Sequence, residues 1–243
     1  MPGLGTIVNV AAVLAGGTIG LLLKKILSER LTDMITQGLG LAVLIVGLSG
    51  VFTSALSLSE SGLVFNYLLF MILSLAVGAL LGELFRIEDH VESLSGKLGG
   101  MFKSSNSSLF AEGFMSATLL FTVGAMAIVG SLEDGINRNT DILFVKSALD
   151  FISAMVFAGA FGAGVLLSAI PVGIYQGILT VLALFLSKIL TDTVISQMTL
   201  IGSVLIVGLS LNMLKIAKIK VSNLLPAIFI PLIYYAFSVV FGL

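Results

Sequence analysis

The sequence has no cysteine, no tryptophan and only one histidine, His90, among its 243 residues. The absence of cysteine excludes disulfide bonds and thiolate chemistry. A single histidine, expected outside the bilayer, cannot supply a serine–histidine–aspartate site at membrane depth. No group of histidine and carboxylate residues has metal-ligand spacing, and no HExxH or Walker A pattern occurs. We therefore expect a protein that is not an enzyme, with no metal or other cofactor and no ATP-binding site of its own.

Charged residues are also scarce, at 10% of the chain, whereas hydrophobic residues make up 58% and the mean hydropathy is +1.17. A soluble domain carries about 25% charged residues, so this composition could not cover a surface exposed to water. The long apolar stretches lack the period-two alternation of β-barrel strands. The net charge of -1 offers nucleic acid no basic surface. The sequence predicts an all-α polytopic membrane protein whose main partner is the lipid bilayer.

Apolar stretches long enough to cross a bilayer, about 20 residues each, predict about eight transmembrane helices. The stretch 142–190 is long enough for two crossings, with Pro171 as the corner, because proline opens a helix more readily than it continues one. One crossing with a re-entrant hairpin is the alternative. The N-terminus lacks the basic region and cleavage site of a signal peptide, so we interpret it as a retained span. The predicted spans are 4–23, 36–56, 63–85, 113–132, 142–167, 172–190, 195–214 and 222–242.

The positions of lysine and arginine support the count of eight. With eight spans, nine of the 12 fall in the loops after spans one, three, five and seven, whereas the opposite loops hold only Arg138 and Lys188. With seven spans, Lys215, Lys218 and Lys220 would change sides and the bias would weaken. By the positive-inside rule, the nine are cytoplasmic and both termini lie outside.

The seven-residue string VLIVGLS occurs twice, at 43–49 and at 204–210. LKKIL and ITQ precede the first copy, and LSKIL and ISQ precede the second copy in the same order. Spans one to three therefore resemble spans six to eight. Because five helix positions, an odd number, separate the two units, the second unit is inserted upside down, which is a common architecture of transporters.

This repeat organises a single transmembrane domain, residues 1–243. Between the third and fourth spans, apolar residues from Ile87 to Leu98 fall on one helical stripe, which favours an amphipathic helix lying on the membrane surface. The predicted organisation is a first repeat at 1–85, a cytoplasmic amphipathic helix and linker at 86–112, central spans four and five at 113–170, and the inverted repeat at 171–243.

Many of the 27 glycines are spaced for helix packing. Gly16–Gly20 and Gly78–Gly82 form GxxxG motifs, which let two helix backbones approach closely in lipid. The stretch AGAFGAG differs, because it lies within a segment longer than one crossing requires and each glycine weakens a helix by up to ~1 kcal/mol relative to alanine. It predicts an unwound hinge that exposes carbonyl groups to a substrate ion, with a tilted continuous helix as the alternative. The expected hinge residues are Gly159, Gly162, Gly164 and Pro171.

The strongest candidate site lies in DILFVKSALDFISAM, which opens the predicted fifth span. Lys146 and Asp150 are one helical turn apart and therefore point to the same face. A charge near the membrane centre costs at least ~2.5–3.5 kcal/mol, and such residues often mark an ion or proton path. An ion pair that only locks the bundle is the alternative, because a buried pair is weak support for any function. The hydroxyl groups of Ser147 and Ser153 lie nearby in the sequence.

Amide side chains near the span ends give further candidates. Gln37 and Gln197 occupy matching positions in the two repeats, which suits a symmetric site. Such amides more commonly form interhelical hydrogen bonds or helix caps. We include them, with Gln176 and Asn212, among the residues expected to bind a substrate or ion.

Six motifs, GTIVN, ITQGLGLAVLIVG, VGAMAIVGSLEDG, FVKSALD, SAIPVGIYQG and NLLPA, together resemble the YdfK/YqgA-like bacterial membrane proteins, the domain of unknown function 554. The resemblance covers essentially the whole chain. It implies a multi-pass protein of the bacterial inner membrane, in an uncharacterised family whose members are often labelled transporters. It supplies no established site residues. Phe151 stands where the family commonly has a glycine, so the resemblance does not imply a close backbone approach there.

These features favour a secondary transporter of a small solute or ion that alternates access between the two repeats. In this hypothesis Asp150 binds a cation or a proton. A passive channel, and a membrane scaffold or sensor that transports nothing, are the alternatives. A homo-oligomer is a further partner that the sequence neither predicts nor excludes.

Overall fold

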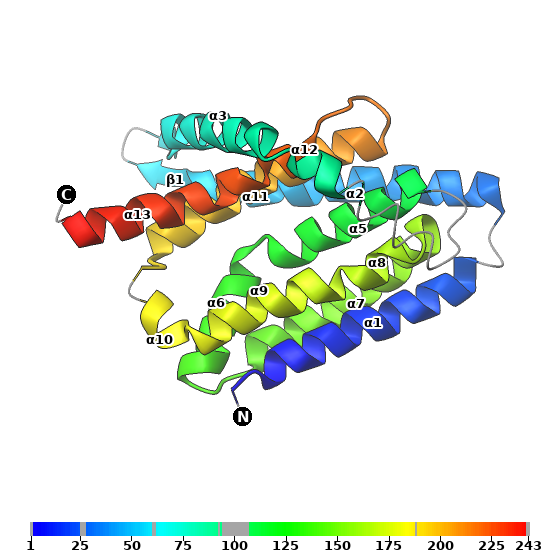
Figure 1. Ribbon diagram of the computed structural model, residues 1–243, viewed down its shortest axis with the longest axis horizontal. Coiled ribbons are helices and arrows are strands. Elements are labelled where there is room, and N and C mark those ends of the chain that lie inside the picture. Colours follow the sequence, from blue (N-terminus) through cyan, green and yellow to red (C-terminus); the bar gives the residue numbers. More distant parts are fainter. Residues whose placement is uncertain are drawn as a thin grey trace.

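The computed structural model describes residues 2–24, 28–59, 62–91, 93, 107–187 and 189–241. Helices dominate, and most of them run along the longest axis of the molecule (Figure 1). The longer helices are α1 (Leu4–Lys24), α2 (Glu29–Ala55), α3 (Leu68–Leu84), α5 (Ser107–Thr122), α6 (Ala125–Ile136), α7 (Asp141–Phe161), α9 (Ala169–Val181), α11 (Asp192–Met213) and α13 (Ile230–Phe241). The shorter elements are β1 (Leu56–Ser59), β2 (Gly62–Phe65), α8 (Gly164–Leu167), α10 (Ala183–Leu186), α12 (Val221–Leu224) and the 3-10 helix η1 (Leu225–Phe229).

The predicted helical membrane fold is confirmed in its coarse form. Six helices are long and apolar enough to cross a bilayer, and the bent pair α5–α6 would make a seventh. α3 matches the third predicted span but has only 17 residues, so the number eight stays a prediction. The all-α expectation misses one feature, because β1 and β2 form an antiparallel hairpin between α2 and α3. Leucine and serine alternate in β1, which is the period of a strand.

The segment 142–190 forms two separate candidate spans, but its corner is not at Pro171. α7 ends at Phe161, and Gly162 adopts a φ of +92°, which glycine reaches without strain. Pro171 lies in the first turn of α9, where its missing N–H removes no hydrogen bond of the helix. The predicted boundaries of 142–167 and 172–190 are therefore wrong, and the chain turns within the glycine-rich stretch instead.

The fourth predicted span, 113–132, is not one helix either. α5 and α6 meet at an angle of 57°, and Gly124 adopts a φ of +129° at the break. Residues with a side chain rarely adopt this conformation, so one glycine permits the break. The sequence does not reveal it, because glycine is also frequent within continuous membrane helices.

The helices form two groups that lie side by side (Figure 1). The first group contains α1 and α5 to α9, and the second contains α2, α3 and α11 to α13. The first helix of each predicted repeat, α1 or α9, thus lies in the first group, whereas the later helices of both repeats lie in the second. Buried apolar side chains of both groups share one core, in which Val13 and Phe157 lie with Val43 and Leu205.

α1 and α7 lie parallel and close together because glycine lines their contact. A methyl group on Gly16 would collide with the carbonyl oxygen of Phe151, and a methyl group on Gly20 would collide with that of Met155. The close backbone approach next to Asp150 is therefore provided by a glycine on the opposite helix. The packing role predicted for both GxxxG motifs is confirmed, since Gly78 and Gly82 are packed in the same way against Ala227 and Asn223.

Both ends of α1 are held by polar contacts within the first group. The buried carboxylate of Asp134 accepts hydrogen bonds from the backbone N–H groups of Gly3, at 3.2 Å, and Gly5, at 3.0 Å. A negative charge at a helix N-terminus is favourable. At the other end, the Lys24 ammonium donates a hydrogen bond of 3.1 Å to the carbonyl oxygen of Ala160, near the C-terminus of α7. These contacts hold the N-terminal end of α1 against α6 and its C-terminal end against α7.

α2 and α11 pack antiparallel, and the two copies of VLIVGLS face each other across their contact. Gly40 packs against Leu214, Gly47 against Val207, and Gly50 against Ser203. Gly47 and Val207 both belong to the repeated string. A segment that packs antiparallel on its own copy is the arrangement expected near a two-fold axis.

The two termini lie toward the same end of the molecule, the end at which α10 lies (Figure 1). The C-terminal ends of α1 and α11 point to the opposite end. Lysine-containing segments follow both of these helices, as the eight-span prediction requires. Residues 87–91 are helical. Residue 92 and residues 94–106 of the predicted amphipathic helix and linker lie outside the described residues, whereas residues 107–112, predicted as linker, belong to α5.

Candidate functional site

A buried ion pair joins Lys146 and Asp150 on one face of α7. Each residue is only 6% exposed. Their spacing of four residues places them on successive turns, as the sequence predicts. Beside them, the hydroxyl of Ser147 donates a hydrogen bond of 2.6 Å to the carbonyl oxygen of Leu143, so its oxygen can still accept.

A buried amide pair lies next to the ion pair and joins α1 to α9. The side-chain nitrogen of Asn9 donates a hydrogen bond of 3.3 Å to the side-chain oxygen of Gln176, and both residues are 0% exposed. The Asn9 amide also interacts with the Asp150 carboxylate. Among the described residues, Asn9 Oδ1 and Gln176 Nε2 have no hydrogen-bond partner. The pair can therefore still accept one hydrogen bond through Asn9 Oδ1 and donate through Gln176 Nε2.

Two buried hydroxyl groups continue this polar surface by one helical turn. Thr6 lies one turn before Asn9 on α1, and Thr180 lies one turn after Gln176 on α9. Their hydroxyl oxygens likewise have no partner among the described residues. Because α1 and α9 run antiparallel here, with Val10 packed against Gly173, both hydroxyls lie on the side nearer the chain termini.

The break between α5 and α6 borders the same cluster. The ammonium group of Lys146 lies 5.9 Å from the ring centre of Phe121. A cation over an aromatic face is attracted by the ring quadrupole. Phe121 is fully buried and lies three residues before Gly124, the glycine of the break. The ion pair thus has a discontinuous helix as its neighbour. We call the set of Thr6, Asn9, Phe121, Lys146, Ser147, Asp150, Gln176 and Thr180 the polar cluster.

The polar cluster can bind a small polar species but offers little for covalent chemistry. It contains one carboxylate, one ammonium group, two amides and hydroxyls, and it contains no thiol or imidazole. Among the described residues, no group of three histidine, cysteine, aspartate or glutamate residues could hold a metal ion. In a medium of low polarity, charges and dipoles interact far more strongly than in water. A ligand that replaced one of these contacts would therefore change the strength of the remaining interactions in the cluster.

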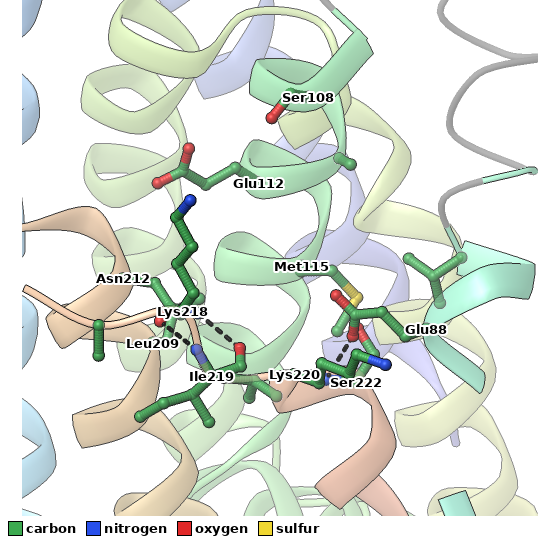
Figure 2. A pocket seen from close by; sticks show the side chains of 14 residues that line it. Glu88, Ser108, Glu112, Met115, Leu209, Asn212, Lys218, Ile219, Lys220 and Ser222 are labelled. Carbon is green, nitrogen blue, oxygen red and sulfur yellow. Dashed lines mark hydrogen bonds between the residues drawn. The ribbon is translucent and has the colours of Figure 1, made fainter. Parts of the chain in front are cut away.

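A separate pocket of about 750 Å³ opens between α5, α11 and the segment that follows α11 (Figure 2). The side chains of Glu112 and Lys218 point toward each other across it. Met115 and Leu209 give it an apolar wall. Its other polar lining residues are Glu88, Ser108, Asn212, Lys220 and Ser222.

The pocket and the polar cluster lie at different levels of α5. Glu112 lines the pocket and Phe121 borders the cluster, and nine residues of helix correspond to about 13 Å. Between them, the side chains of Met115, Ala117 and Leu119 are buried in the apolar core. No residue of the polar cluster lines the pocket, so the two are separate sites in this structure.

The structure brings together only some of the residues predicted for the site. Lys146, Ser147, Asp150 and Gln176 lie in the polar cluster, to which α1, α5, α7 and α9 contribute residues. Asn212 instead lines the pocket and hydrogen-bonds through its side chain to both backbone groups of Ile219, at 2.7 and 2.8 Å. Of the remaining candidates, Ser153 and Gln197 are half-buried and Gln37 is exposed.

Sequence reasoning gave no site role to Asn9, Phe121, Thr6 or Thr180. An amide or hydroxyl near a span end is most commonly a cap or an interhelical contact, and nothing local distinguishes Asn9 from Gln37. The position of Asn9 in the motif GTIVN was the available signal. Phe121 carries no signal of its own, because its role depends on the break three residues later.

Comparison with known proteins gives three matches. The family described as "Protein of unknown function (DUF554)" matches residues 4–236. A protein of Bacillus subtilis (strain 168), "Uncharacterized membrane protein YdfK", is 32% identical over 239 residues, which cover 98% of each chain. A protein of Escherichia coli (strain K12), "Uncharacterized protein YqgA", is 30% identical over 229 residues, which cover 93% of each chain. No solved structure matches this chain.

Proposed function

The chain belongs to the DUF554 family, and on that premise we propose that it is a secondary transporter of a small solute or ion whose binding site is the polar cluster. A relative is named a membrane protein, and the helices of this chain are long and apolar enough to cross a bilayer. The proposal concerns what the cluster does within that membrane.

The observation that carries the proposal is a buried charged cluster whose polar atoms are only partly paired. A buried polar atom without a partner costs roughly 1–3 kcal/mol. Asn9 Oδ1 and Gln176 Nε2 both bear this cost, although the two side chains are hydrogen-bonded to each other through their other amide atoms. Two apolar side chains in their place would avoid the cost. An ion pair that served only as a lock would gain from full pairing. Unpaired polar atoms close to a buried ion pair suit a site that receives a ligand.

The broken helix next to the cluster supports the same function. Transporter sites are commonly formed by discontinuous helices, whose unwound backbone and helix ends interact with substrate and ions. Here Phe121 precedes the break at Gly124 and contacts Lys146. A change in the angle between α5 and α6 would therefore move Phe121 relative to the Lys146 ammonium group.

The repeated segments supply the symmetry that alternating access needs. We infer an inverted repeat of the α1–α3 and α9–α13 regions, with its axis near the contact of Gly47 with Val207. The antiparallel contact of α1 with α9, at Asn9 and Gln176, fits the same axis. The polar cluster then lies where the first helices of the two repeats meet, as in other transporters built this way.

The pocket fits an entrance from one side. Four of its lining residues are charged, namely Glu88, Glu112, Lys218 and Lys220, and Met115 and Leu209 give it an apolar wall. By the positive-inside rule, the lysine-rich segment after α11 faces the cytoplasm. We interpret the arrangement as a form open toward the cytoplasm and closed between Met115 and Phe121.

The two alternatives differ from this proposal in the side of the membrane from which the solution can reach the cluster. A channel exposes the cluster to both sides at once and conducts a steady current. A scaffold keeps the cluster dry at all times. A transporter exposes the cluster to each side in turn and conducts no steady current.

Accessibility of Ser147 tests the proposal without knowledge of the substrate. Because the chain has no cysteine, Ser147→Cys introduces a single thiol next to the ion pair. Right-side-out and inside-out vesicles are treated with a small, membrane-impermeant methanethiosulfonate, and ionic currents are recorded in planar bilayers. We expect labelling from both sides and no steady current.

Ser210→Cys is the matched control. Ser210 is also buried, also donates a hydrogen bond to a carbonyl oxygen of its own helix, at 2.7 Å, and does not line the pocket. We expect it to stay unlabelled. A folded Ser147→Cys protein that resists labelling from both sides, as the control does, would contradict the transporter and support the scaffold. Labelling accompanied by a steady current would support the channel.

A further inference from the structure

The polar cluster holds one negative and one positive side chain, so its net charge is zero while the two are paired. A second cation can approach Asp150 only if the positive charge of Lys146 is removed, since excess buried charge is strongly unfavourable. Building on the proposed function, we infer that the cluster exchanges a monovalent alkali cation for a proton: the cation takes the place of the Lys146 ammonium beside Asp150, and Lys146 becomes neutral.

The polar cluster contains further oxygen atoms suited to such a cation besides the carboxylate itself. Asn9 interacts with Asp150, and its side-chain oxygen has no partner among the described residues. The hydroxyl oxygens of Thr6 and Thr180 are also buried and have no partner among the described residues. Thr6 lies one helical turn from Asn9 on α1, and Thr180 lies one helical turn from Gln176 on α9. Carboxylate, amide and hydroxyl oxygens are the ligands that hard cations prefer. No thiolate or imidazole competes to attract a softer transition metal.

The number of charges favours a monovalent ion over a divalent one. Asp150 is the only carboxylate in the cluster, and it balances one positive charge. A divalent cation beside it would leave one positive charge unbalanced even after Lys146 had lost its proton. Divalent sites usually gather several carboxylates, and the described residues show no such group.

A neutral Lys146 would keep a suitable environment. Its amine group lies over the face of Phe121, which is apolar and fully buried. The other charged or titratable groups on the helices around it are engaged or placed elsewhere. Asp134 binds the N-terminus of α1, Glu133 binds Asn137, and Lys24 binds Ala160. Glu112 lines the pocket, and Tyr175 on α9 packs against a separate group of buried apolar side chains. Three further groups are exposed, namely Arg30, Asp33 and Asp141.

The exchange step is balanced without any redox partner. The cation forms contacts with the oxygens of Asp150 and Asn9, one N–H bond of the Lys146 ammonium breaks, and the proton passes to water on the side to which the cluster is open. Release of the cation to the other side reverses the step. One cation then moves in one direction for each proton that moves in the other.

Proton release on cation binding tests this inference with the whole protein in detergent. Sodium, lithium or potassium chloride is added to a weakly buffered solution, with choline chloride as the control for ionic strength and chloride. A pH indicator reports released protons, and the shift of the thermal unfolding temperature reports binding. For at least one of the three ions, we expect stabilisation together with release of about one proton per chain.

Variants of Lys146 separate exchange from simple binding. Lys146→Arg keeps a positive charge but cannot lose its proton under these conditions, so the salt should no longer release protons or stabilise the protein. Lys146→Gln has no fixed positive charge beside Asp150 and should still be stabilised by the cation. Lys215→Arg, an exposed substitution of the same kind outside the pocket and the cluster, should behave as the unaltered protein.

Three outcomes would overturn the inference. They are stabilisation of the unaltered protein by a cation without proton release, unchanged proton release from Lys146→Arg, and no response to any of the three ions. Proton uptake caused by choline chloride would instead identify an anion site. None of these outcomes alters the labelling expected at Ser147→Cys, so failure of the exchange and failure of the transporter proposal can be distinguished.

Discussion

The side-chain amides of Asn9 and Gln176 meet at 3.3 Å inside the protein, although 167 residues separate them in the chain. Each amide has one polar atom without a partner among the described residues, and the Asn9 amide also interacts with Asp150 of the ion pair. This relationship joins α1, α7 and α9 in one polar surface. It is the reason we treat the ion pair as part of a site and not as an isolated lock.

The hydrogen bond between Asn9 and Gln176 should be measurable as a coupling energy. Asn9→Leu and Gln176→Met each remove one partner and leave the other amide buried and unpaired. Hydrogen bonds between membrane helices contribute about 0.6 kcal/mol on average and up to about 1.7 kcal/mol. We expect the double variant to lose less stability than the sum of the two single losses, in a double-mutant cycle measured by unfolding in mixed micelles. Strictly additive losses would show that the two amides do not interact.

Removing one member of the ion pair should cost more than removing both. Asp150→Asn leaves the ammonium of Lys146 buried without its counter-ion, which typically costs about 3–5 kcal/mol. The double variant Lys146→Met/Asp150→Asn leaves no net buried charge, and we expect it to recover most of this loss. The free energy of unfolding of the two proteins gives the comparison. A double variant that is less stable than Asp150→Asn would contradict the pairing.

The contact of α1 with α7 should tolerate no side chain at Gly16. Gly16→Ala places a methyl group against the carbonyl oxygen of Phe151, and overpacking of this kind costs about 1–3 kcal/mol. Gly38→Ala is the matched control, because a methyl group there meets nothing within 4 Å. We expect the control to be neutral or more stable, since alanine favours a helix by up to ~1 kcal/mol over glycine. Equal effects of the two substitutions would argue against the close packing of α1 on α7.

The break between α5 and α6 should depend on Gly124. Its φ of +129° is strained for any residue with a side chain, at a cost of about 1–3 kcal/mol. Gly124→Ala should therefore lower the unfolding free energy, whereas Gly177→Ala, within α9 and with open space around it, should not. If the break positions Phe121 beside Lys146, Gly124→Ala should also change the labelling rate of Ser147→Cys. An unchanged rate would separate the break from the cluster.

Hydropathy and charge predicted much of this architecture because both act locally. The first predicted span, 4–23, corresponds to α1 at Leu4–Lys24, and the seventh, 195–214, corresponds to most of α11 at Asp192–Met213. The pairing of Lys146 with Asp150 followed from their spacing on one helix. Each of these predictions needed only the period of the helix and the length of a crossing.

The features that sequence reasoning missed depend on backbone angles or on contacts between distant segments. Gly124 lies in a glycine-containing apolar stretch, and nothing local shows that it adopts a positive φ while Gly16 stays helical. Gly162, which also adopts a positive φ, is in contrast one of the expected hinge residues. The sequence predicts the corner at Pro171 because proline can open a helix, yet Pro171 lies within the first turn of α9 and the chain turns earlier. Asn9 gained its role only from the approach of Gln176, which no local pattern encodes.

Ion flux in liposomes tests the central claim, that Asp150 in the polar cluster carries transport, most directly. Liposomes containing the protein and a trapped pH indicator are exposed to an inward gradient of sodium, lithium or potassium. We predict that at least one of these gradients makes the lumen more alkaline, as protons leave while cations enter, and that Asp150→Asn abolishes the change. The same pH change in the unaltered protein and in Asp150→Asn would contradict the account.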